Sequence, residues 1–541
     1  IPADTGNINI KLNEYRLNNA RIVYEDATLP MKAEIIGLNH SGSGNFTLDV
    51  YDLVTKTSAE KLTVVYDGVK YLNKIKLDAD VEMKIDMEKD LRIDLKNNLI
   101  AINDLQVALE GWVAMPGDNI DMNLVYKAQN TSFKSILSLV PGIYTESFAD
   151  VKTDGSLAFD GGVKGTYNET QLPGFFVNLN VANATVQYPD VPKPITGINM
   201  DMKVNNEDGN LENTIIDIQA LHADFGSNPI DAKVWVKGLE NIQVKGHVNA
   251  NLNLDEVMAM YPVEGTDLKG KFKLDATADG TYNEARGTFP KVNAVMDMTE
   301  GYVKNAEYPA ELTKLNFHAT LLNEDGSLEK SIFDIPNFSF LLDGEPIEGK
   351  AHVENFDNPH YQVNASGSLD LEKLMQIYPI DSMTLKGRMI VDQFATSGKY
   401  SDIEAENYTN LASSGTIEIQ NLEYTDYYLP HPVTVESGKA SFTPSRLEFT
   451  DAKGKLGSSD YQVSGYFSNY MAYALMDNQK LKGKMTLNSR KMDLNEWMEE
   501  EESTATSGAN SEESELEVFP VPDNLDIELD ANIGQVIYDD L

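Results

Sequence analysis

A short pattern recurs four times along this chain of 541 residues. Each copy consists of an apolar strand, a residue that favours a helix N-cap, about two helical turns and, in three copies, a proline. The copies read SFKSILSLVP from Ser132, NLDEVMAMYP from Asn253, DLEKLMQIYP from Asp370 and DLNEWM from Asp493, and their helical parts begin 121, 117 and 123 residues apart. Such a period indicates an array of similar structural units, in which function can extend along a whole surface.

Other segments repeat at the same interval. GTYNE occurs at 165–169 and again at 280–284, and NEDGNLE at 206–212 returns as NEDGSLE at 323–329. We therefore predict a partial, enlarged β unit, three β repeat units, an acidic disordered linker and the start of a further β unit, at 1–132, 133–253, 254–370, 371–498, 499–517 and 518–541.

The two ends of the chain resemble each other. NNARIVYEDA at 18–27 is similar to NIGQVIYDDL at 532–541, so a new unit begins near the C-terminus and then stops. The sequence begins without Met and without a signal sequence. We expect it to be a fragment of a longer protein.

Between the helical segments, apolar and polar residues alternate. Residues 81–87 place Val, Met, Ile and Met on one face and Glu, Lys and Asp on the other, and 248–253 and 363–370 show the same pattern. A period of two with turns every roughly 8 to 12 residues is typical of antiparallel strands with one wet face. We expect about 8 to 10 strands in each unit and about 40 in the chain.

The dry face of so large a sheet needs a cover. Open sheets rarely exceed about 10 strands without curling or splitting, and one short helix per unit covers little apolar area. Two covers remain possible, either a second sheet that closes a sandwich or an apolar guest in an open groove. The helices themselves have apolar stripes at i, i+3, i+4 and i+7, so we expect them to pack against the sheet as structural elements.

Composition excludes several functions. The chain has 85 acidic and 44 basic residues, a formal net charge of −41, which opposes binding to nucleic acids and to anionic membrane surfaces. It contains no Cys, so disulfides and thiolate metal sites are absent from its chemistry.

Catalytic motifs are also missing from the sequence. The seven His residues have no metal-site spacing, and there is no nucleophile elbow, phosphate-binding loop or dinucleotide-binding motif. We predict a protein that is not an enzyme, with no catalytic, cofactor-binding or metal-binding residues. The acidic stretch at 499–517 is interpreted as a solvated linker.

Several of these patterns together resemble the AsmA family. They are the strand that leads into LDLEKLMQIYP, the NEDGSLE turn, the strands LKGKFKLDATADG at 268–280 and LKGRMIVDQF at 385–394, and the NARIVYED turn. The resemblance implies a bacterial envelope protein, anchored in the inner membrane by an N-terminal helix and projecting into the periplasm. It also implies kinship with bridge-like lipid-transfer proteins, whose repeated β units form grooves that are apolar inside.

The resemblance favours a mainly β fold, in which a long, highly twisted antiparallel sheet curls into a groove built from repeats of about 120 residues, each with one short helix. The expected function is non-enzymatic transfer of phospholipid between the inner and outer membranes during outer-envelope biogenesis. The partners would be phospholipid or another acyl lipid, the inner membrane and outer-membrane proteins. The expected groove lining is Val81, Met83, Ile85, Met87, Val248, Ala250, Leu252, Phe272, Leu274, Val363, Ala365 and Leu369.

Two other functions remain open on the sequence. A rod of closed β-sandwich domains could bind protein or glycan partners, with exposed aromatic residues such as Trp235 on its polar faces. A scaffold for the assembly of outer-membrane proteins could use the same groove. For every predicted lining residue, the alternative interpretation is the core of a sandwich.

Overall fold

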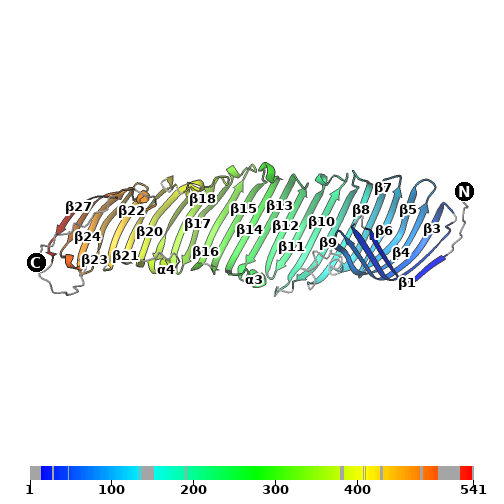
Figure 1. Ribbon diagram of the computed structural model, residues 1–541, viewed down its shortest axis with the longest axis horizontal. Helices are drawn as coiled ribbons and strands as arrows, with labels where there is room; N and C mark the ends of the chain where they lie inside the picture. The colour runs from blue at the N-terminus through cyan, green and yellow to red at the C-terminus, as the bar shows by residue number, and fades with distance from the viewer. Residues whose placement is uncertain are drawn as a thin grey trace, which may run out of the picture. The chain divides into compact units, whose positions relative to one another are not determined.

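A computed structural model describes residues 14–26, 30–46, 48–132, 135, 151–188, 191, 193–306, 308–377, 383–405, 407, 410–426, 431–475, 479–497 and 524–538. The chain is mainly β, with a few short helices (Figure 1). The helix expected after Ser132 falls largely outside these residues, and the acidic linker at 499–517 falls wholly outside them.

The chain divides into two compact units. The first comprises residues 1–262 and 273–293, and the second comprises 263–272 and 294–541, so β14 (Thr266–Tyr282) and β15 (Lys291–Asn305) contribute to both. The other strands of the first unit are β1 (Glu14–Asp26), β2 (Met31–Gly44), β3 (Val50–Tyr66), β4 (Val69–Asp86), β5 (Leu91–Ile102), β6 (Leu105–Met115), β7 (Ile120–Ser132), β8 (Lys152–Tyr167), β9 (Gly174–Gln187), β10 (Ile195–Asn206), β11 (Ile215–Phe225), β12 (Asn228–Lys237) and β13 (Ile242–Asn253).

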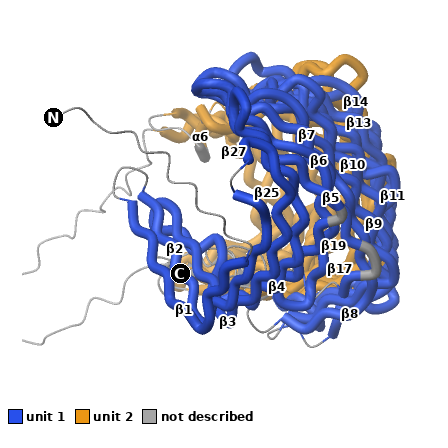
Figure 2. Tube along the Cα trace, turned by 90° about the vertical axis from the view of Figure 1, so that its right-hand side faces the viewer, with its two compact units in different colours: residues 1–262, 273–293 blue, residues 263–272, 294–541 orange. Residues whose placement is uncertain are grey.

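In the first unit, each strand from β1 to β13 pairs with the next one in antiparallel orientation. The resulting sheet is strongly curled, as the blue tube in Figure 2 shows. The short helix α3 (Leu254–Met260) follows β13, and the 3₁₀ turns η1 (Leu211–Asn213) and η2 (Glu284–Arg286) lie in connections between strands.

The second unit continues with β16 (Tyr308–Asn323), β17 (Ile332–Leu342), β18 (Glu345–Glu354), β19 (His360–Asp370), β20 (Met383–Lys399), β21 (Ala412–Asp426), β22 (Val433–Thr443), β23 (Arg446–Leu456), β24 (Ser459–Ser468), β25 (Leu481–Ser489), β26 (Met492–Asp493), β27 (Leu525–Ile533) and β28 (Val536–Ile537). Its helical elements are η3 (Leu328–Lys330), α4 (Leu371–Ile377), α5 (Tyr400–Glu404), α6 (Tyr470–Leu475) and η5 (Leu494–Trp497).

Pairing in the second unit is antiparallel from β16 to β25. The C-terminal strands depart from the antiparallel sheet that the sequence predicts, because β27 pairs with β25 in parallel and β28 pairs with β26 in parallel. The fourth predicted helix is a 3₁₀ turn, η5, which begins at Leu494.

The described residues contain 28 strands rather than about 40. The sequence estimate was wrong because it assumed a turn every roughly 8 to 12 residues, whereas β3 and β4 have 17 and 18 residues. Several Asn and Gly residues lie inside the long strands at β-bulges, where a positive φ bends the strand without ending it. Asn183 (φ 49°) in β9 and Gly197 (φ 61°) in β10 are examples.

An asparagine side chain connects the bulges of neighbouring strands by hydrogen bonds, and we call this asparagine the clasp. The Asn199 side chain accepts a hydrogen bond from the Asn183 backbone N–H at 3.0 Å and donates one to the Gly197 carbonyl at 2.7 Å. Asn316 makes the same two bonds to Glu300 and Lys314, 117 residues later. Asn39 makes them to Asn19 and Gly37 in the hairpin of β1 and β2.

The short helices tie strand ends to a nearby hairpin turn. The side chain of Asn253 caps α3 and accepts a hydrogen bond from the Asp255 N–H, as the sequence predicts. The backbone N–H of Asn253 in turn donates to the buried side chain of Asn228, which begins β12. At the last copy, the Asp493 N–H donates to Ser459 Oγ at 2.9 Å. These hydrogen bonds to hairpin turns support the structural role that the sequence predicts for the short helices.

Candidate functional site

One face of the first unit is apolar across many strands. In one row, directly paired residues of six strands are Val248, Ala232, Leu221, Met200, Val181 and Leu157. A second row on the same face crosses eight strands through Val244, Val236, Ile216, Val204, Val177, Gly161, Tyr126 and Leu109. Directly paired residues lie on the same face of a sheet, so these rows form a continuous apolar surface.

Side chains of this apolar face pack against their neighbours on the same face, and the face remains partly exposed. Leu157, Val181 and Ala184 are buried, and Phe159, Leu179, Ile198 and Met200 pack against them while only partly buried. In a closed sandwich the inner face would be fully buried by the opposing sheet. Most side chains of the two rows keep part of their surface accessible, and no second sheet covers them in the described residues of either unit.

The structure places the predicted lining residues on half-buried strand positions, with two exceptions. Ala250 is buried at 6% exposure, and Met87 lies one residue beyond the end of β4 and is 47% exposed. Met83 is paired directly with Leu53 and Leu95. The remaining partly buried positions are Val81, Ile85, Val248, Leu252, Phe272, Leu274, Val363, Ala365 and Leu369.

The second unit has an apolar face of the same kind. Ala365 pairs with Gly349 on one side and with Phe394 on the other, and Val363 pairs with Ala351. Aromatic rings on this face repeatedly lie over a glycine of the neighbouring strand. A Cβ built at Gly349 would lie 2.7 Å from Phe338 Cζ, and one at Gly415 would lie 2.9 Å from Phe442 Cζ. The rings therefore lie close to the sheet, where a larger residue than glycine would displace them.

The opposite face carries charged and amide side chains. Two histidines are paired with carboxylates there: His222 with Asp231 at 2.8 Å, and His318 with Asp297 at 2.8 Å. The hydrogen bond that the His222 ring donates to Asp231 raises the pKa of His222 above its usual range. The two faces of the sheet thus differ sharply in polarity.

No group of three or more His, Asp or Glu side chains among the described residues could hold a metal ion. In the same part of the chain, no helix has the length and apolar character needed to cross a membrane.

Sequence reasoning missed much of the apolar face. Leu157, Val181, Met200 and Leu221 belong to its longest-range rows, yet none was singled out. The alternation in SLAFDGG and FFVNLNVANATV carried the signal. Which residues meet across strands follows from register, and register shifts at the bulges between β9, β10 and β11 cannot be counted from alternation alone.

Comparison with known proteins adds no relative. A scan against protein-family models, a search of curated proteins and a search of solved structures each found no match.

Proposed function

We propose that the chain is a non-enzymatic lipid-transfer conduit, in which the apolar face holds the acyl chains of phospholipids. The observation that carries this proposal is the partly open apolar face, which extends in register across the strands of each unit. A soluble domain that leaves so extended an apolar surface uncovered by protein needs another apolar partner. We further propose that this face lines the inside of the curl.

The energetics favour acyl chains as that partner. Burying one CH₂ group contributes roughly 0.8 kcal/mol, so each chain segment gains from contact anywhere along the rows. The rows consist mostly of aliphatic side chains, which suits movement along the surface better than tight capture. The polar opposite face would remain in water.

The setting of the proposal is the periplasm of a diderm bacterium. The resemblance to the AsmA family supports a full-length protein anchored in the inner membrane, with lipid moving toward the outer membrane during envelope biogenesis. The net charge of −41 favours lipid contact through the apolar face rather than adsorption of the polar face to anionic head groups.

Lipid content tests this function directly. Protein purified without detergent from bacterial envelopes should contain phospholipid, measured by solvent extraction and mass spectrometry. Val363→Asp should lower the lipid-to-protein ratio several-fold, because a carboxylate on the apolar face opposes acyl contact. Gln362→Asp is the matched control, since Gln362 is the exposed neighbour on the opposite face of β19.

Two results would contradict the proposal. Absence of phospholipid from the wild-type protein, or equal lipid content in the two variants, would exclude the apolar face as a lipid site. Circular dichroism of both variants should match the wild type, which separates loss of lipid from loss of the fold.

A further inference from the structure

The polar face, opposite the proposed lipid face, is hollowed at each clasp. Pit 1 has a volume of about 560 Å³ beside Asn39, pit 2 about 390 Å³ beside Asn199, and pit 3 about 410 Å³ beside Asn316. Paired bulges displace the strands locally, so that these hollows form on the face of the sheet. Pits 2 and 3 recur with the structural repeat, because Asn199 and Asn316 are 117 residues apart, whereas pit 1 forms at the clasp between β1 and β2.

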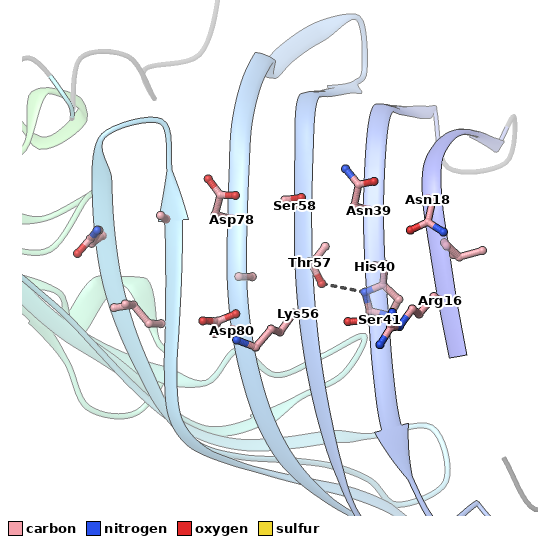
Figure 3. Close-up of a pocket in the computed structure, with 15 residues that line it drawn as sticks. Arg16, Asn18, Asn39, His40, Ser41, Lys56, Thr57, Ser58, Asp78 and Asp80 are labelled. Carbon is pink, nitrogen blue, oxygen red and sulfur yellow. Dashed lines mark hydrogen bonds between the residues drawn. The ribbon is translucent and has the colours of Figure 1, made fainter. Parts of the chain in front are cut away.

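The pits also share their side chains in register. From each clasp asparagine a row of directly paired residues runs across the next strands. Pit 1 has Asn39, Ser58, Asp78 and Ala101; pit 2 has Asn199, His222, Asp231 and Asn249; pit 3 has Asn316, Ser339, Glu348 and Ser366. Figure 3 shows three residues of the first row, Asn39, Ser58 and Asp78, with Asn18 of β1 beside Asn39. A carboxylate occupies the third position of every row.

The chemistry of the pits fits a neutral ligand rich in hydroxyl groups. The amide and hydroxyl groups of the pits can donate and accept hydrogen bonds, and their carboxylates can accept them. The hydroxyl groups of a ligand, which also donate and accept, can therefore bond to them. In pit 1 the charges of Arg16 and Lys56 offset those of Asp78 and Asp80, and pits 2 and 3 each hold two carboxylates and one Lys. A polyanion would meet a carboxylate in every pit. In pits 2 and 3 a peptide strand could not extend the sheet, because the backbone at these positions lies within paired strands.

We propose that the pits bind a neutral carbohydrate polymer. Pits 1 and 2 lie on strands β2 and β10, eight strands apart in the first unit, or about 40 Å along the sheet at ~4.8 Å per strand. A long glycan can occupy both, and linked weak sites strengthen binding by at least about tenfold over a short oligosaccharide. This function is separate from lipid transfer because it uses the other face.

Pit 2 has an aromatic neighbour that strengthens the assignment. Trp235 follows the pit residue Lys233 by two positions on β12, so both lie on the polar face. Trp235 is partly exposed. The electron-rich face of an indole ring attracts the C–H groups of a sugar ring, in the same way that it attracts other positive edges.

A binding assay tests the proposal on the full chain. Neutral oligosaccharides and long polymers of glucan, mannan, galactan and chitin type are titrated against the protein by calorimetry. We expect at least one polymer to bind at least about tenfold more tightly than its hexamer. Asp231→Ala and Glu348→Ala should each weaken polymer binding several-fold, and Asp231→Asn should recover part of the loss.

Controls keep a negative result informative. Glu448→Ala changes a carboxylate of β23 outside the three pits and should leave binding unchanged. Thermal unfolding and lipid content of all variants should match the wild type, so loss of glycan binding is not loss of the fold or of the lipid face. No binding to any of the neutral glycans, or binding that the pit variants leave unchanged, would overturn the proposal.

Discussion

At the scale of single residues, polar side chains fix the turns that carry the strands. Asn206 is 1% exposed and satisfies the NEDG turn by donating to the Asn210 carbonyl and accepting from the Gly209 N–H. Asn323 does the same 117 residues later, with the Ser327 carbonyl and the Gly326 N–H. A buried amide with its partners in place is costly to replace, which explains why this short segment recurs.

Glu256 makes a side-chain contact whose contribution to stability depends on pH. It lies in the first turn of α3, accepts a hydrogen bond from Ser227 Oγ and contacts Lys193 Nζ at 3.0 Å. These contacts, the Ser227 hydrogen bond first, lower its pKa from 4.5 to about 2. Because the folded-state pKa is depressed, the stabilisation is complete above the unfolded value of 4.5 and is lost as the pH falls toward 2.

We predict that Glu256→Gln destabilises the contact between α3 and the β11–β12 turn at neutral pH. Amide hydrogen exchange near Ser227 should be faster in the variant at pH 7, and the difference from wild type should shrink between pH 4.5 and 2. Glu264→Gln, at an exposed position beyond the helix, is the control. A difference that is independent of pH would show that charge has no part in the contact.

At the scale of elements, the clasp decides where a hairpin bends. Asn183, with φ 49°, adopts a left-handed conformation that non-glycine residues rarely occupy, and its N–H points to the side chain of Asn199. The bend and the side chain that stabilises it come from adjacent strands. Removing the side chain should therefore loosen both strands together.

We predict that Asn199→Ala lowers the local free energy of opening of β9 and β10 by about 1 kcal/mol, which is typical of a lost hydrogen bond. Hydrogen exchange of their amides should accelerate by about fivefold. Asn180→Ala, on β9 outside the clasp, provides the comparison. Equal acceleration in the two variants would mean that the clasp contributes no more than an ordinary strand asparagine.

At the scale of the whole molecule, an extended apolar face conflicts with the strongly acidic character of the chain unless something covers that face. Formal charge of −41 resists self-association, whereas exposed apolar area favours it. Bound lipid would resolve the conflict by covering the apolar area while leaving the acidic surface in water.

We predict that delipidated protein self-associates and that added phospholipid restores the monomer. Analytical ultracentrifugation before and after lipid extraction measures this change, and high salt should increase association by screening the charge. A delipidated preparation that stays monomeric at all salt concentrations would count against a lipid-covered face. The lipid-loaded protein carried through the same procedure without extraction is the control.

Much of the fold could be predicted from particular residues. The alternation around Val81 and Val248 identified strands and their apolar face, and the caps Asn253 and Asp370 located the beginnings of α3 and α4. The strand number could not be predicted in this way. Asn and Gly occur in bulges as well as in turns, so the sequence alone does not tell which of the two Asn183 and Gly197 form. Only the pairing with neighbouring strands distinguishes a bulge from a turn.

The sequence by itself determined the repeat, the β class and the separation of apolar from polar faces, because each depends on spacing along the chain. Tertiary structure decided whether the apolar face was closed by a second sheet, and which residues met across it. It also produced the pits, since Asn199, His222 and Asp231 come together only through strand pairing. Local periodicity specifies which face a side chain occupies, whereas register and curling specify its neighbours.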